Sequence, residues 1–337
     1  AGRGVAAAAL AVGLITLVLG GLTVARNQDY HDPEQMWRDV LAYSPRNPRA
    51  HHNLGIALAD RQRFDQAIDS LQQALSIWPE YAAAHRHLGA AYLKSNQLES
   101  AITHLRQAVL LEPEQPRAHL YLGEAMRRVG QLDEAERSMR RARELAPRSV
   151  EVAERLGTLY LRTSRLDEAE PLLRYAARQP NTGIARSNLG LLLSNTGRLE
   201  EAERVLREAI EIDDTLSGAW NNLGIVYARS RRFSSARDAF RQAVRLNPAD
   251  TGAWTNLGRL AEQREDWAQA AACYRHAINR GADRPTLWRM LVEVLRKAND
   301  LDAAEEAARE AVRSHPEANA LRSVRDWLAE RSMIEEE

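Results

Sequence analysis

Histidines recur at a spacing that could place several imidazole rings in one row. His51, His85 and His119 are each 34 residues apart, and because imidazole is a common zinc ligand, such a row suggests metal binding. Tryptophan takes the equivalent position later in the chain, at Trp220, Trp254 and Trp288. Equivalent positions on stacked helices lie about 10 Å apart, which two Zn–N bonds of about 2 Å cannot bridge. We therefore predict a packing role for the row, with no metal and no other cofactor.

Asparagines form a second row, directly before a repeated Leu-Gly pair. They are Asn53, Asn188, Asn222 and Asn256, and Asn221 adds a neighbouring amide. Since a carboxamide both donates and accepts hydrogen bonds, it can pair with the backbone of an extended peptide whatever that peptide's sequence. Other residue types take the same position elsewhere, namely His87, Tyr121, Arg155 and Met290. We predict peptide binding by these amides, with a solvated polar face as the alternative.

Basic residues form a third row, thirteen positions into several units of the same period. The row consists of Lys94, Arg128, Arg162, Arg229 and Lys297. A cation at the end of a helix interacts favourably with the helix dipole, which is the simpler interpretation. The alternative is that the row anchors an acidic peptide or a terminal carboxylate.

The chain carries no signature of catalysis. It has no phosphate-binding loop, no G-x-G-x-x-G, no H-E-x-x-H, no Cys-x-x-Cys and no G-x-S-x-G. Its single cysteine, Cys273, excludes an intrachain disulfide and is expected to be a small packed thiol. Because 46 basic residues balance 46 acidic ones, no net charge attracts nucleic acid. We predict that this chain is not an enzyme and does not bind nucleic acid.

The elements that position these rows are repeated units. A Leu-Gly pair recurs every 33 or 34 residues, with its glycine at Gly55, Gly89, Gly123, Gly157, Gly190, Gly224 and Gly258. Alanine follows each glycine after 12 residues and again after 19. Small side chains at such positions let two helices approach to about 8–10 Å. An eighth unit keeps Leu291, Ala304, Ala311 and Pro316, with Val292 in place of glycine.

This pattern resembles the tetratricopeptide repeat, a 34-residue helix–turn–helix unit. The resemblance implies an all-α fold, a right-handed superhelix (α-solenoid) of eight repeats. It also implies that the asparagine row faces a concave groove, similar to the asparagine ladder of O-linked N-acetylglucosamine transferases. The two-carboxylate clamp of chaperone-binding family members is not reproduced.

The expected boundaries follow from the period. The eight repeats are 48–81, 82–115, 116–149, 150–182, 183–216, 217–250, 251–284 and 285–318. A linker and a capping half-repeat (26–47) precede them, and a capping helix with an acidic tail (319–337) follows.

Residues 5–24 contain no charge and are flanked by Arg3 and Arg26. Twenty residues at about 1.5 Å each span a bilayer core of about 30 Å. We predict an N-terminal transmembrane helix (1–25) with the lipid bilayer as its partner; the alternative is a signal peptide cleaved after Ala25. One arginine at each end leaves the orientation open.

The junction between this segment and the repeats carries a second resemblance. Its residues are Arg26-Asn27, Trp37, Pro45, Asn47, Arg49, Ala50 and Asn53-Leu54-Gly55. They resemble the corresponding segment of transmembrane and tetratricopeptide-repeat O-mannosyltransferases. In that family a multi-span glycosyltransferase domain precedes repeats on the non-cytoplasmic side. The resemblance implies that this chain, which begins with Ala rather than Met, is the C-terminal portion of such a protein.

Three functional hypotheses follow. The first is a membrane-tethered scaffold whose concave groove binds an extended segment of a partner protein. The second is the substrate-recruiting region of a membrane glycosyltransferase, and the third is a secreted or periplasmic assembly factor.

Overall fold

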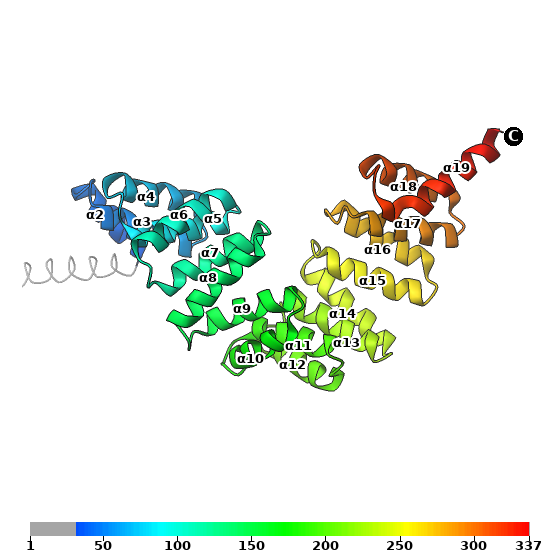
Figure 1. Ribbon diagram of the computed structural model, residues 1–337, viewed down its shortest axis with the longest axis horizontal. Coiled ribbons are helices and arrows are strands. Elements are labelled where there is room, and N and C mark those ends of the chain that lie inside the picture. The colour runs from blue at the N-terminus through cyan, green and yellow to red at the C-terminus, as the bar shows by residue number, and fades with distance from the viewer. Residues whose placement is uncertain (1–31, 337) are drawn as a thin grey trace, which may run out of the picture. The chain divides into compact units, whose positions relative to one another are not determined.

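The computed structural model describes residues 32–336, so the predicted membrane segment lies outside the described residues. Every element between these limits is helical, which confirms the all-helical prediction (Figure 1). Within this range, no helix combines the length and the apolar character needed to cross a membrane.

The helices form eight consecutive pairs. The first helices are α3 (Pro48–Asp60), α5 (Ala82–Lys94), α7 (Pro116–Arg128), α9 (Val150–Arg162), α11 (Gly183–Asn195), α13 (Ser217–Arg229), α15 (Thr251–Gln263) and α17 (Pro285–Lys297). The second helices are α4 (Phe64–Ile77), α6 (Leu98–Leu111), α8 (Leu132–Leu145), α10 (Leu166–Ala177), α12 (Leu199–Ile212), α14 (Phe233–Leu246), α16 (Trp267–Asn279) and α18 (Leu301–Ser314). Three further helical elements flank the pairs: α2 (Pro33–Tyr43), the 3-10 turn η1 (Asn319–Leu321) and α19 (Arg322–Glu336).

Local sequence explains where many helices begin. Pro116 and Pro285 stand in the first turn of their helices, where the missing N–H has no partner to lose. Side-chain caps start others: Asn47 accepts hydrogen bonds from the N–H groups at the start of α3, and Asp250 does the same for α15. The turn inside a pair contains one residue in the left-handed region, such as Gly197 at φ 80°.

The described residues form two compact units, divided after Leu159. Unit 1 contains α2 to α8 and the beginning of α9; unit 2 contains the end of α9 and the remaining elements. In unit 1, Trp37 and Leu41 of α2 cover the outer side of the first pair. In unit 2, Leu321 and Val324 are buried against the last pair.

Six of the eight pairs are held by a close crossing between a glycine and a large side chain of the second helix. A Cβ atom added at Gly224 would lie 2.5 Å from Cε1 of Phe240, and one added at Gly55 would lie 2.6 Å from Cγ of Leu71. Alanine lines the same seam: Ala236 and Ala243 have no exposed surface. Larger side chains at these positions would force the helices apart, since protein interiors leave no spare volume.

We predict that Gly224→Ala lowers the free energy of unfolding by about 1–3 kcal/mol, because the new methyl group overfills the crossing with Phe240. Gly218→Ala on the same helix is the matched control, since nothing lies within 4 Å of its Cβ position. The control should leave stability unchanged or raise it by less than about 1 kcal/mol. Urea denaturation of both variants measures this, and equal midpoints would contradict the crossing.

Candidate functional site

The histidine and tryptophan row has a structural role. The imidazole Nε2 atoms of His51 and His119 lie 2.8 Å from the carbonyl oxygens of Pro45 and Pro113, six residues earlier. Trp254 donates its indole N–H to the carbonyl of Pro248 at 3.0 Å in the same way. Both ring types therefore supply an N–H to the turn that precedes the helix, so Nε2 of these histidines carries the proton. Across residues 32–336, no cluster of three potential ligand side chains could hold a metal.

In unit 2, the predicted asparagines connect consecutive first helices. Asn222 on α13 donates to the backbone oxygen and to Oγ of Ser187 on α11, at 3.2 and 3.1 Å. Asn256 on α15 donates to Oδ1 of Asn221 on α13 at 2.9 Å. Because Asn222 is only 8% exposed, its amide is committed to holding helices together. This placement corrects the expectation that Asn222 is available to a ligand.

The other members of the row are more accessible. Asn188, Asn221 and Asn256 are half-buried on three successive first helices of unit 2. Asn53 is also half-buried, but it belongs to α3 of unit 1. Four of the five predicted asparagines therefore lie on consecutive first helices of unit 2, and Asn53 lies on the first helix of the first pair in unit 1.

A cavity of about 270 Å³ lies beside Asn256, lined by α15, α17 and the turn that precedes α17. Sequence reasoning missed its other polar lining residues, namely Thr251, Thr255, Arg259, Arg284 and Thr286. Arg259 is three residues from Asn256 and Thr286 is four from Met290, so helical spacing could have identified these two, because such residues share one face of a helix. Together they offer hydroxyl, amide and guanidinium groups to a ligand.

The predicted basic row also serves the packing of neighbouring repeats. The guanidinium of Arg128 donates to the carbonyl of Leu93 at 3.0 Å, at the end of the preceding first helix. Arg229 donates to the carbonyl of Ser194 in the same manner. The helix-dipole interpretation therefore applies to the neighbouring helix rather than to the residue's own. Lys297 pairs with Glu262 at 3.7 Å, whereas Lys94 and Arg162 are exposed at the ends of α5 and α9.

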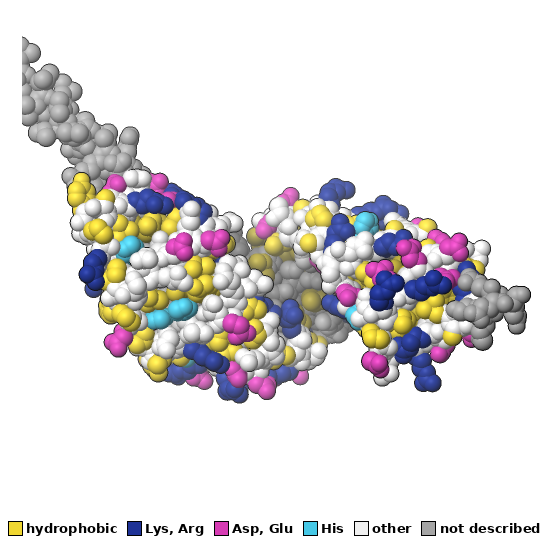
Figure 2. Space-filling view, turned by 90° about the horizontal axis from the view of Figure 1, so that it is seen from above, with side chains coloured by type: hydrophobic (Ala, Val, Ile, Leu, Met, Phe, Trp, Pro, Cys, Tyr) yellow, Lys and Arg dark blue, Asp and Glu magenta, His cyan; other side chains and the backbone are white. Residues whose placement is uncertain are grey.

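Figure 2 shows basic and acidic side chains interspersed over the face in view. Many of these charges pair between consecutive second helices. Arg232, before α14, bonds to Glu203 of α12, and Arg198, before α12, pairs with Glu170 of α10 at 2.6 Å. The hydrogen bond from Arg232 outweighs burial and lowers the pKa of Glu203. The arginine-rich composition thus has a structural use.

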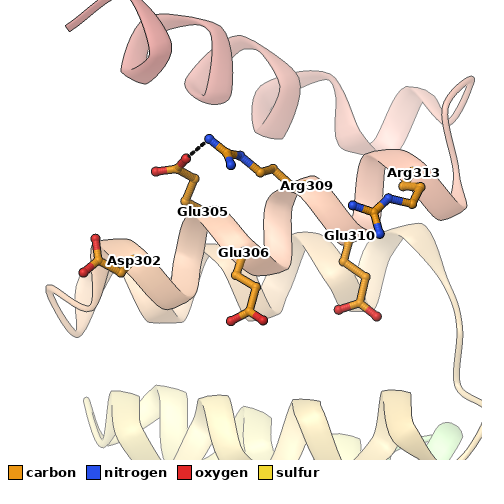
Figure 3. A pocket seen from close by; sticks show the side chains of 6 residues that line it. All are labelled: Asp302, Glu305, Glu306, Arg309, Glu310 and Arg313. Atoms are coloured by element: carbon orange, nitrogen blue, oxygen red, sulfur yellow. Dashed lines mark ion pairs between the residues drawn. The ribbon is translucent and has the colours of Figure 1, made fainter. Parts of the chain in front are cut away.

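A second charged surface lies along α18 (Figure 3), around a cavity of about 420 Å³. Glu305 pairs there with Arg309 and, at 2.7 Å, with Nε of Arg331 on α19. Glu306 and Glu310 extend to the side of α18 away from that ion pair. These contacts attach the final helix to the last pair, so we assign this surface to stability.

Unit 1 carries a ring cluster at the position that asparagine holds in unit 2. The ring centroids of His52 and His87 lie 5.0 Å apart, and Nδ1 of His52 is 3.1 Å from the hydroxyl of Tyr81. Burial, and then the charge of Arg86, lowers the pKa of His87 to about 3. This part of the first-helix layer is therefore neutral and aromatic at neutral pH.

We predict that His87 makes unit 1 sensitive to acid. Its folded-state pKa of about 3 lies below the ordinary value of 6.5, so the unfolded chain binds the proton more readily. Stability is therefore lost as pH falls below about 6.5. Between pH 7.5 and 4.5, His87→Gln should lose about 1–2 kcal/mol less stability than the parent, after allowance for partial exposure. His276→Gln, at an exposed position of α16, is the control for urea denaturation; an equal loss in parent and His87→Gln would contradict the assignment.

The fold and these faces define a helical-repeat protein, and comparison with known families agrees. Two family models, both described as tetratricopeptide repeat, match the chain. One matches residues 58–123, and the other matches residues 19–85, 126–181, 155–217, 221–285 and 289–324, which is more than half of the chain. The chain belongs to the tetratricopeptide-repeat family.

Solved structures share this fold. The crystal structure of the APC/C hetero-tetramer Cut9–Hcn1 matches with a TM-score of 0.64 and 18% identity, over 81% of this chain and 55% of that chain. A tetratricopeptide-repeat protein from Parabacteroides merdae matches with a TM-score of 0.59 and 14% identity, over 74% of this chain and 98% of that chain. At these identities the similarity shows the fold alone. No curated protein matches the chain.

Proposed function

We propose that this chain is a protein-interaction scaffold that holds an extended segment of a partner protein against the first helices of unit 2. The observation that supports it is the cavity beside Asn256, which opens between two first helices and is lined mainly by polar groups. Neither Arg259 nor Arg284 has an ion-pair partner among residues 32–336, so both are available to a ligand.

The chemistry of the cavity suits a peptide backbone. Asn256 uses one N–H on Asn221 and keeps its oxygen and its second N–H. The hydroxyl of Thr255 donates to the carbonyl of Thr251 at 2.7 Å and can still accept a hydrogen bond. Met290 adds a flexible apolar surface. The cavity therefore offers hydrogen-bond donors, hydrogen-bond acceptors and one adaptable apolar side chain. These groups suit a peptide that is bound mainly through its backbone.

We predict that Asn256→Ala weakens peptide binding about fivefold, the effect of losing a typical hydrogen bond. An array of random dodecapeptides attached through their carboxyl ends, probed with the whole chain, measures the effect. Asn279→Ala, the same change at the exposed end of α16, is the matched control and should bind as the parent does. Asn222 is not a suitable test residue, because its loss breaks the contact with Ser187. Equal binding by Asn256→Ala and the parent would refute the site.

We also propose that residues 5–24 tether the scaffold to a membrane, with the repeats on the non-cytoplasmic side. This proposal is supported by twenty uncharged residues between Arg3 and Arg26. The whole chain should stay with membranes in alkaline carbonate, and a chain lacking residues 1–25 should be released. Recovery of a processed chain that begins after Ala25 would favour a signal peptide instead.

The link to a membrane glycosyltransferase is the alternative proposal, supported by the junction residues. Two of these residues also have local structural roles: Asn47 caps α3, and Trp37 packs against the first pair. In this alternative the repeats recruit the substrate, and the chemistry belongs to another part of the protein. The gene upstream of Ala1 decides it, because an initiation codon directly before Ala1 would exclude a preceding catalytic domain.

A further inference from the structure

A cavity of about 430 Å³ lies on unit 1, where the first helices α5, α7 and α9 adjoin. Its lining includes Arg86 on α5, Arg117 on α7 and Glu151 on α9. Both arginines lack a hydrogen-bond or ion-pair partner within residues 32–336. The cavity therefore combines open volume with uncompensated positive charge.

Arg86 is the more constrained of the two arginines. It is half-buried, and its Nε atom is inaccessible to solvent and has no hydrogen-bond partner among the described residues. Burial lowers the pKa of Arg86, and the nearby charge of Arg117 lowers it further, against smaller raising effects of Tyr121 and Glu112. Leaving a buried guanidinium nitrogen unpaired costs free energy that an anionic partner would recover.

The acidic residue that lines this cavity does not bond to Arg86. Glu151 is already paired with Arg155 at 3.2 Å. Glu112 attracts Arg86 electrostatically, but it forms no ion pair with it. By contrast, Arg61 and Arg63 of unit 1 both pair with the carboxylate of Glu34. The hydrogen-bonding positions of the Arg86 guanidinium are therefore open to a ligand carboxylate.

The start of α7 adds to the positive electrostatic potential at this cavity. Gln115, the residue before the helix, makes no side-chain hydrogen bond to its first turn, and Pro116 follows it. The amino end of a helix carries a partial positive charge that favours an anion. Gln115, Pro116 and Arg117 all line the cavity.

We propose that this cavity binds the carboxylate of an aspartate or glutamate side chain in an extended segment of a partner protein. A planar guanidinium matches a carboxylate with two parallel hydrogen bonds. Arg86 is the fifth residue of its first helix, as Ser187 and Asn221 are of theirs, and those two receive the contacts between first helices in unit 2. The inference rests on the proposed function, since a peptide carries the acidic group.

The test uses the whole chain on the random dodecapeptide array, in which carboxyl-end attachment removes the terminal carboxylate. Bound peptides should be enriched in aspartate and glutamate. Arg86→Gln and Arg117→Gln should each reduce binding of the acidic peptides about tenfold, the effect of losing a charge-assisted hydrogen bond. Arg140→Gln, an equal change of charge at an exposed position of α8, should leave the enrichment unchanged. Urea midpoints close to that of the parent show that the variants are folded.

The outcomes separate this inference from the proposed function. Peptide binding without acidic enrichment, or enrichment that survives both pocket substitutions, overturns the inference and leaves the scaffold proposal standing. Absence of binding to any peptide overturns both. A soluble acidic peptide whose affinity depends on a free carboxyl end, and not on its internal acidic residues, would also overturn the assignment to a side chain.

Discussion

The close crossing of the two helices inside a repeat, made by glycine in six of the eight, is the constraint on which the rest of the structure depends. Glycine on the first helix admits the ring of Phe240 or the branch of Leu71 to within van der Waals contact of the backbone. The alanines beside it are fully buried. With the two helices fixed in this way, a pair presents its remaining apolar surface to the next pair, and stacking becomes the route to a buried core.

Polar contacts then fix how consecutive pairs meet. Arg128 and Arg229 reach the carbonyl groups at the end of the preceding first helix, and Asn222 bonds to the first helix before its own. On the other layer, arginines such as Arg232 pair with carboxylates of the preceding second helix. These contacts satisfy buried or half-buried polar groups, which would otherwise cost free energy. They also explain why so many charged residues produce no large single-sign surface on the face in view (Figure 2).

Arginines that lack such contacts are therefore candidates for binding a ligand. Arg86 and Arg117 in unit 1, and Arg259 and Arg284 in unit 2, stand beside cavities on the first-helix layer. Arginines such as Arg128 and Arg232 bond to a helix-end carbonyl or a carboxylate, whereas these four line open volume. The two cavities differ in chemistry: Asn256 and threonines surround one, whereas Glu151, Ser149 and the start of α7 surround the other.

The sequence by itself determined the family, the helical pairs and the packing role of the histidine row, because each depends on a side-chain size or an N–H group that recurs every 33 or 34 residues. It also showed that the asparagines and the basic residues each recur at one position of the repeat. Only the tertiary structure decided which members of these rows bond within the chain: Asn222 and Arg229 bond to residues 35 positions earlier. It also identified Arg86, which belongs to neither row and whose Nε has no partner among the residues described. The physical reason is that the repeat period fixes the position of a residue on its helix. The hydrogen bonds of its side chain depend instead on which residue of the neighbouring repeat lies opposite.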